Sequence, residues 1–170
     1  MPTLTSASKK ARLMNEFNAL RKVPLNDLYR WAIAKGEETP YVKSYVVTYT
    51  NPYPTKGNAI TGRMTIQNEI TIRFDLDDDY PNSCPKASIV KGDIPFLTNV
   101  FTSGNFCFGN LYRSTLFLWE WFNIVGRILA GDPLYTNTDS PANHEARVFY
   151  DRWSRKFPVG QITFPRARGL

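Results

Sequence analysis

Apolar residues recur at helical spacing near the start of the chain, where residues 7 to 22 read "ASKKARLMNEFNALRK". Basic side chains occupy most of the remaining surface of this segment. The pattern predicts an amphipathic helix that packs on the core through one stripe. The stripe has four members, namely Leu13, Met14, Phe17 and Leu20.

Patterns typical of strands follow this helix. Residues 41–49 ("YVKSYVVTY") are rich in β-branched and aromatic side chains, and residues 59–66 ("AITGRMTI") come after the turn-rich segment "NPYPTKGN". Residues 70–76 alternate between apolar and polar side chains, as expected of a strand with one buried face. A short segment, residues 86–90 ("KASIV"), completes the set. We therefore predict a meander of four antiparallel strands.

The second half of the chain contains a long loop and two helices. Residues 95 to about 115 show no strong period, and long ordered loops often carry function. Residues 118–129 are apolar on most faces, which predicts a central, buried helix. A last helix is expected from about residue 142 to 156, after the polar loop "LYTNTDSP". The fold class is therefore predicted to be α+β.

Length and composition indicate one cytoplasmic domain. A chain of 170 residues has the size of a single domain, with an expected core at about 7–157 and a tail at 158–170. No apolar run approaches the roughly 18 residues of a membrane span, and the segment "MPTLTSASKK" lacks the pattern of a signal peptide. Two cysteines are too few for a disulfide framework, which fits a reducing compartment.

The net charge of +6 permits binding to nucleic acid or to an acidic protein surface, and also suits an ordinary globular protein. No recognisable nucleic-acid-binding motif is present, and the helical aromatic residues fall at positions that face a core. We therefore expect neither nucleic acid nor a membrane as a partner.

Cys107, in the segment "LTNVFTSGNFCFGN", is the principal candidate for chemistry. A thiol carries an acyl group well as a thioester, because it is nucleophilic near neutral pH and leaves readily when an amine attacks. Gly104 permits a tight turn that would expose the thiol. A lone cysteine is more often buried and inert, which is the role expected of Cys84 in its proline-containing turn.

Two other readings of the cysteines are open. His144 is the only histidine and would serve as the base of a Cys/His hydrolase with Cys107, although no third residue that orients it is evident. A zinc site from Cys84, Cys107 and His144 would lack the paired ligand spacing of such sites. We expect no metal and no cofactor.

The order of the predicted elements, together with five short segments, resembles the ubiquitin-conjugating enzyme family over roughly residues 7–157. "YPNSCPK" is similar to the family's Tyr-Pro-x-x-Pro-Pro-Lys turn, and "SGNFC" to its Ser/Asn-Gly-x-x-Cys active-site turn. Asn99 precedes Cys107 by eight residues, the spacing from the Asn of the family's His-Pro-Asn motif to its cysteine. "LAGDP" resembles Leu-x-x-Asp-Pro, and "TDSPANHEA" resembles the acidic entry to the next helix.

The chain departs from the family pattern at three places. Leu97-Thr98-Asn99 stands in place of His-Pro-Asn, so other groups must hold the asparagine. Asn82 replaces a phenylalanine that commonly docks ligases, and Ser114-Thr115-Leu116 replaces a Ser-Pro-Ala loop, which leaves the usual ligase surface without support. Similarly divergent enzymes occur in bacterial operons that encode their own ubiquitin-like protein, and the resemblance implies a conjugation system of that kind, with a role in antiviral defence.

The resemblance implies that Cys107 accepts a ubiquitin-like modifier from an activating enzyme as a thioester and passes it to an amine of a protein substrate. Asn99 would donate a hydrogen bond to the oxyanion formed during transfer. Asp139 would position the lysine and help it to lose its proton, unless it caps the last helix instead. Asp132 is a weaker candidate and is expected to be a structural residue at a helix end.

The resemblance also implies that the basic first helix docks the activating enzyme through Lys9, Lys10 and Arg12, although a solvated helix face would have the same composition. The alternative function is a binding module that holds a ubiquitin-like protein without forming a bond to it.

Overall fold

The computed structural model describes residues 5–157 and residue 165. Three α-helices, six strands and a short 3-10 helix occur in the described part of the chain. In chain order they are α1 (Ser6–Arg21), β1 (Tyr29–Ile33), β2 (Ser44–Tyr49), β3 (Tyr53–Gly57), β4 (Met64–Gln67), β5 (Ile70–Asp75), β6 (Lys86–Lys91), α2 (Leu118–Leu129), α3 (His144–Trp153) and η1 (Ser154–Lys156).

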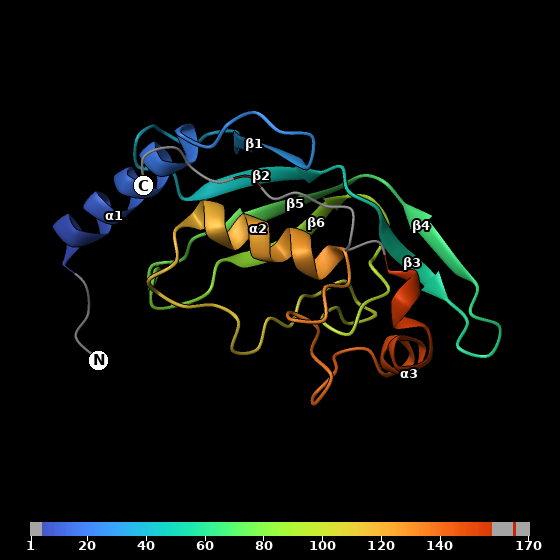
Figure 1. Ribbon diagram of the computed structural model, residues 1–170. Helices are drawn as coiled ribbons and strands as arrows, with labels where there is room; N and C mark the ends of the chain where they lie inside the picture. Colours follow the sequence, from blue (N-terminus) through green and yellow to red (C-terminus); the bar gives the residue numbers. More distant parts are fainter. Residues whose placement is uncertain (1–4, 158–164, 166–170) are drawn as a thin grey trace.

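Four of the strands form one antiparallel sheet in the order β1-β2-β5-β6. Helix α2 lies across one face of this sheet, α1 lies at one end of the molecule, and α3 lies near the opposite end (Figure 1). The predicted α+β class is confirmed, with an N-terminal helix, a four-stranded antiparallel sheet and later helices.

One predicted strand is wrong, and one strand was missed. Of the predicted residues 59–66, only 64–66 are extended, as part of β4. This strand pairs with β3 in a separate two-stranded sheet. The missing sheet strand is β1, which pairs with β2 along its whole length. The pairs Tyr49↔Ile70 and Tyr53↔Gln67 show that β3 and β4 continue the β2–β5 hairpin beyond a short break.

The break in that hairpin has a local cause. Pro52 lies between β2 and β3, on the same arm of the hairpin. Because proline lacks a backbone N–H, it cannot donate a ladder hydrogen bond to the opposite arm. Beyond the break the hairpin turns toward α3, which Figure 1 shows beside β3 and β4. Gly57 of β3 makes this approach possible, because a Cβ there would lie 2.4 Å from Phe96 and 2.9 Å from Phe149 of α3.

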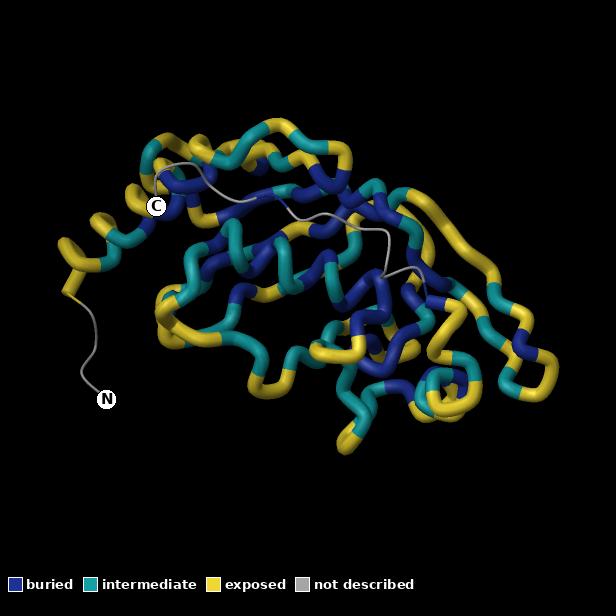
Figure 2. The backbone as a smooth tube through the Cα atoms, viewed as in Figure 1, coloured by how far each residue is buried: buried dark blue, intermediate teal, exposed yellow. Residues whose placement is uncertain are grey.

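The core lies between the four-stranded sheet and α2, where Figure 2 shows the buried backbone. The alternation of β5 is confirmed, since Ile70, Ile72 and Phe74 are fully buried. The ring of Phe122 on α2 lies 5.0 Å from the ring of Phe74. Burial of each such side chain stabilises the fold by roughly 1.5–3 kcal/mol. Helix α2 spans the predicted residues 118–129.

Helix α1 packs on the core less fully than predicted. Leu13 and Leu20 are buried, but Met14 is 37% exposed, so its assignment to the apolar stripe is wrong. Glu16 takes a buried position instead, next to the start of α2. Helix α1 lies at the end of the molecule and buries only a narrow face against the core. Met14 lies outside this buried face.

The last predicted helix, 142–156, is divided into α3 and η1. The side chain of Asn143 caps α3 by accepting a hydrogen bond from the backbone N–H of Ala146 at 3.0 Å. Except for Pro165, the tail expected at 158–170 lies outside the described residues. No helix in the described part of the chain is long and apolar enough to cross a membrane.

Candidate active site around Cys107

The segment before Cys107 forms a tight, hairpin-like turn. Val100 and Phe106 form an isolated antiparallel bridge, and the N–H of Phe101 donates to the carbonyl of Asn105 at 2.9 Å. Gly104 has a φ of +89°, a conformation that favours glycine, so the predicted tight turn is confirmed. The N–H of Cys107 donates to the carbonyl of Asn99 at 2.7 Å, which places the two residues side by side.

Two phenylalanines anchor this turn to α2. The rings of Phe106 and Phe108 stack at 5.4 Å, and the Phe108 ring meets Trp121 of α2 edge to face at 4.8 Å. Cys107 lies between these two core-contacting residues and remains partly exposed, with a free thiol. The turn therefore leaves Cys107 partly exposed while its two neighbours contribute to the core.

The side chain of Asn99 is 2% exposed and joins the Cys107 turn to the loop after α2. Its Nδ2 donates to the carbonyl of Tyr135 at 3.1 Å and, less closely, to the carbonyl of Cys107 at 3.5 Å. Its Oδ1 accepts from the backbone N–H of Asn137 at 3.2 Å. Both donor hydrogens of the amide therefore have backbone partners.

Thr98 helps to hold Asn99 in place, a role for which the sequence alone indicated no residue. Its hydroxyl donates to Oδ1 of Asn99 at 3.1 Å, and its carbonyl accepts from the N–H of Ala142 at 2.7 Å. Leu97 is buried and its carbonyl accepts from the N–H of Val100 at 3.1 Å. A threonine and a leucine thus hold the turn at the place of the family's His-Pro pair.

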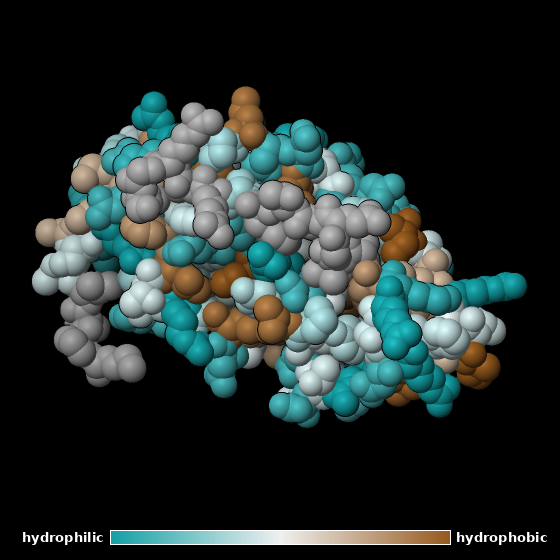
Figure 3. Space-filling model, in the orientation of Figure 1, coloured by the Kyte–Doolittle hydropathy of each residue, from teal (hydrophilic) through white to brown (hydrophobic). Residues whose placement is uncertain are grey.

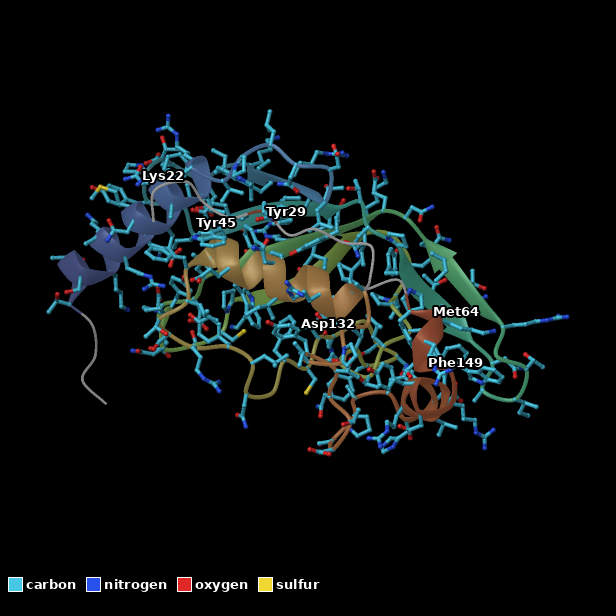
Figure 4. All side chains as sticks on the ribbon, viewed as in Figure 1. Lys22, Tyr29, Tyr45, Met64, Asp132 and Phe149 are labelled. Atoms are coloured by element: carbon cyan, nitrogen blue, oxygen red, sulfur yellow. The ribbon has the colours of Figure 1, made fainter. Side chains whose placement is uncertain are left out.

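Asp139 is exposed, on the loop that contacts Asn99 at Tyr135 and Asn137. It does not cap α3, because Asn143 does so. Asp132 is a structural residue at the end of α2, where Figure 4 labels it. Its carboxylate pairs with Arg127 at 3.0 Å and accepts from the N–H of Leu134 at 3.0 Å.

The second cysteine, Cys84, is also partly exposed, but it packs against the core. Cys84 contacts the core, and its thiol donates to the carbonyl of Pro85 at 3.6 Å. Burial, together with the nearby charge of Asp77, raises the pKa of Cys84 to about 12. A thiol with so high a pKa is almost entirely protonated near neutral pH and is a poor nucleophile.

The geometry supports neither the Cys/His hydrolase interpretation nor the zinc-site interpretation. His144 is exposed on the first turn of α3, and no hydrogen bond joins its imidazole to Cys107 among the described residues. Within the described ranges, no three His, Cys, Asp or Glu side chains gather as a metal ion would require.

The three basic residues of α1 have different surroundings. Lys9 and Lys10 line a hollow of about 330 Å³ beside Leu13, Leu76 and Tyr80. Arg12 instead turns toward the protein, where it pairs with Glu16 at 2.6 Å and donates to the carbonyl of Leu116 at 2.6 Å. The structure therefore separates Arg12 from the two lysines.

Glu16 is the residue near this surface that the sequence reasoning missed. Its carboxylate accepts from the Tyr80 hydroxyl at 2.6 Å and from the N–H of Leu118 at 2.7 Å, besides Arg12. Burial raises the pKa of Glu16, and these hydrogen bonds oppose the shift in part. The i,i+4 spacing of Arg12 and Glu16 was the one available signal, but such pairs are usually exposed.

Two loops that would correspond to a ligase-binding surface lie side by side. The hydroxyl of Tyr112 donates to the carbonyl of Pro81 at 2.9 Å, and Arg12 holds the carbonyl of Leu116. Asn82 is exposed on the first of these loops. The exposed side chain on this loop is therefore an amide.

No protein-family model matches the chain, and a comparison with curated proteins finds no match. Solved structures are similar. S. cerevisiae Ubc12 is 20% identical, with a TM-score of 0.57, over 92% of this chain and 79% of that one. A putative ubiquitin conjugating enzyme from Plasmodium yoelii is 17% identical, with a TM-score of 0.57, over 92% of both chains.

Human ubiquitin-conjugating enzyme E2 G1 is 16% identical, with a TM-score of 0.54, over 76% of this chain and 100% of that one. The similarity of all three is structural, since the identities are low. The chain has the fold of ubiquitin-conjugating enzymes.

Proposed function

We propose that this protein is a conjugating enzyme for a ubiquitin-like modifier and carries the modifier as a thioester on Cys107. The observation that carries the proposal is the free, partly exposed thiol at the end of the Gly104 turn, held beside Asn99 in a fold shared with conjugating enzymes. Both cysteines are partly exposed, but burial raises the pKa of Cys84 to about 12, so its thiol is a poor nucleophile and Cys107 is the thiol proposed to react.

The proposed reaction has two exchanges at the sulfur. The Cys107 thiolate attacks the thioester carbonyl of the modifier on an activating enzyme, and the thiolate of that enzyme leaves. A lysine amine of the target then attacks the new thioester, an amide bond forms and the Cys107 thiolate leaves. The amine loses one proton in the second step, and Asp139 is the exposed carboxylate proposed to position the lysine and accept it.

Asn99 is proposed to act in the second step in two ways. Through Tyr135 and Asn137 it holds the loop of Asp139 against the Cys107 turn. Its weaker hydrogen bond, at 3.5 Å to the Cys107 carbonyl, is the one that its amide would release to donate to the developing oxyanion.

The proposed docking site for the activating enzyme contains fewer basic residues than the resemblance implied. Lys9 and Lys10 form this surface, at a 330 Å³ hollow that Asp77, Asp78 and apolar residues also line. Arg12 is proposed to maintain the contact between α1 and α2 instead, because its guanidinium is already bound to Glu16 and Leu116.

The test is formation of a thioester in a mixture of the protein, its activating enzyme, its modifier and ATP. We expect an adduct of the size of the modifier that thiol reductants remove. Cys107→Ala should abolish the adduct, and Cys107→Ser should give an oxyester that resists reductants. Cys84→Ala is the matched control and should form the adduct at the normal rate.

Two results would contradict the proposal. An adduct on Cys84 would mean that the wrong turn has been assigned to the reaction. Binding of the modifier without any covalent adduct, at equal affinity for the wild type and Cys107→Ala, would identify the protein as a binding module for ubiquitin-like proteins.

A further inference from the structure

Three cations surround a hollow between the β3–β4 hairpin and η1, far from α1 in Figure 1. Lys56 comes from β3, Arg63 from the residue before β4, and Lys156 from η1. The hollow has a volume of about 740 Å³, and Thr65 and Met64 also line it. Figure 4 labels Met64 on this hairpin, and we call the site the basic hollow.

No carboxylate neutralises the basic hollow. None of its three cations forms an ion pair with any residue in the described part of the chain. The sequence contains no Asp or Glu from residue 50 to 68 and none after Asp151. Like charges that are held together repel one another, so the arrangement costs stability unless an anion binds there.

The frame of the hollow is held by contacts between distant segments. Nζ of Lys156 donates to the carbonyl of Gly62 at 2.7 Å and lies 4.9 Å from the centre of the Trp153 ring. The indole N–H of Trp153 donates to the carbonyl of Ala59 at 2.9 Å. The turn of the hairpin is thus fixed against the end of α3, and a fixed site binds with a smaller loss of conformational entropy.

We propose that the basic hollow docks an acidic segment, rich in Asp and Glu, of a partner protein. Apolar side chains lie beside the cations, since Met64 lines the hollow and Ile60 at the hairpin tip is 84% exposed. Figure 3 shows hydrophobic atoms at the tip of the hairpin and hydrophilic side chains around them. Such a mixed surface suits a peptide that combines carboxylates with apolar residues.

Nucleic acid fits the hollow less well. Single strands bind proteins through stacking of bases on exposed aromatic rings as well as through charge. The ring of Trp153 contacts Lys156 on one side, and a Cβ at Gly62 would lie only 2.8 Å from it. The turn and the lysine therefore occupy the ring that a base would need.

The test measures binding of a fluorescent peptide, composed of Glu, Asp and Leu, to the purified full chain by anisotropy at low and high salt. We expect affinity that falls as salt is added, because the contacts are charge pairs at the surface. The double variant Lys56→Gln/Arg63→Gln should weaken binding by roughly tenfold, which corresponds to the loss of about 1.4 kcal/mol. The variant Lys22→Gln/Lys35→Gln, which removes two exposed charges elsewhere, should bind normally.

Equal binding by the two double variants, or no binding by the wild type, would overturn the proposal. Preferential binding of a single-stranded DNA that is lost in Lys56→Gln/Arg63→Gln would overturn it in favour of nucleic acid. The measurement needs neither an activating enzyme nor a modifier, so its result is independent of thioester formation on Cys107.

Discussion

At the scale of single residues, Cys107 and Asn99 differ in how far their environments define their roles. Cys107 lies between two stacked phenylalanines and stays partly exposed, with a free thiol. Asn99 has its polar atoms committed to three backbone groups, so it links the turn and the loop whether or not it also assists catalysis.

Replacement of Asn99 tests both proposed roles of this residue. Asn99→Ala should lower the free energy of unfolding by ~1–3 kcal/mol, because it leaves buried backbone groups without partners. It should form the thioester at a near-normal rate but discharge it to lysine about a hundredfold more slowly if the amide stabilises the oxyanion. Urea unfolding and single-turnover discharge from the purified thioester provide the two measurements.

Asn110→Ala is the matched control, since Asn110 is exposed three residues after Cys107. It should leave both stability and discharge unchanged. A variant at Asn99 that loses stability but discharges at the wild-type rate would show that Asn99 only holds the turn, and the oxyanion would then need another donor.

At the scale of elements, Glu16 connects α1 to α2 and to the turn at Tyr80 through hydrogen bonds from three groups. This contact ties α1 to the loops at Tyr80 and Leu116. The position of α1 therefore depends on a buried carboxylate rather than on an apolar stripe alone.

The raised pKa of Glu16 predicts how stability depends on pH. A carboxyl whose pKa is higher in the folded state than its usual 4.5 keeps its proton more readily when folded. Its contribution to stability is complete below the unfolded pKa and decreases as the pH rises through the folded pKa. The free energy of unfolding of the wild type should therefore fall relative to Glu16→Gln as the pH rises from below 4.5 toward neutrality.

Urea unfolding of both proteins across this range provides the measurement. Glu38→Gln, at an exposed position, is the control and should differ from the wild type by a constant amount. A constant difference for Glu16→Gln as well would mean that the carboxylate is as well solvated in the folded state as in the unfolded state.

At the scale of the whole molecule, the β3–β4 hairpin and α3 form a second packing unit beside the main sheet, and Gly57 sets how closely they approach. Gly57→Ala would place a methyl group against Phe96 and the fully buried Phe149. We expect it to lower the free energy of unfolding by ~1–3 kcal/mol, because the site has no room for an added methyl group.

Thermal or urea unfolding checks this expectation, with Thr65→Ala on the exposed strand opposite as the control. An unchanged stability of Gly57→Ala would mean that Phe96 can move aside. The same hairpin carries the basic hollow, at the end of the molecule opposite α1, so an acidic partner there would leave Lys9 and Lys10 accessible.

The sequence by itself determined the features that depend on short-range pattern. The alternation of residues 70–76 predicted β5 and its buried face, and the apolar character of 118–129 predicted α2. Gly104 before Cys107 predicted the tight turn, because only the backbone conformation of one residue is involved. The strand β1 was missed, because its five residues carry little alternation and are specified by pairing with β2.

Only the tertiary structure decided the features that join distant segments. The β3–β4 pair extends the β2–β5 hairpin, so its register comes from a neighbouring ladder rather than from its own turn-rich sequence. Glu16 is buried because the N–H of Leu118 and the hydroxyl of Tyr80 meet it there. Local patterns report which face of an element is apolar, whereas the partner of a polar group is set by which chain segments meet in space.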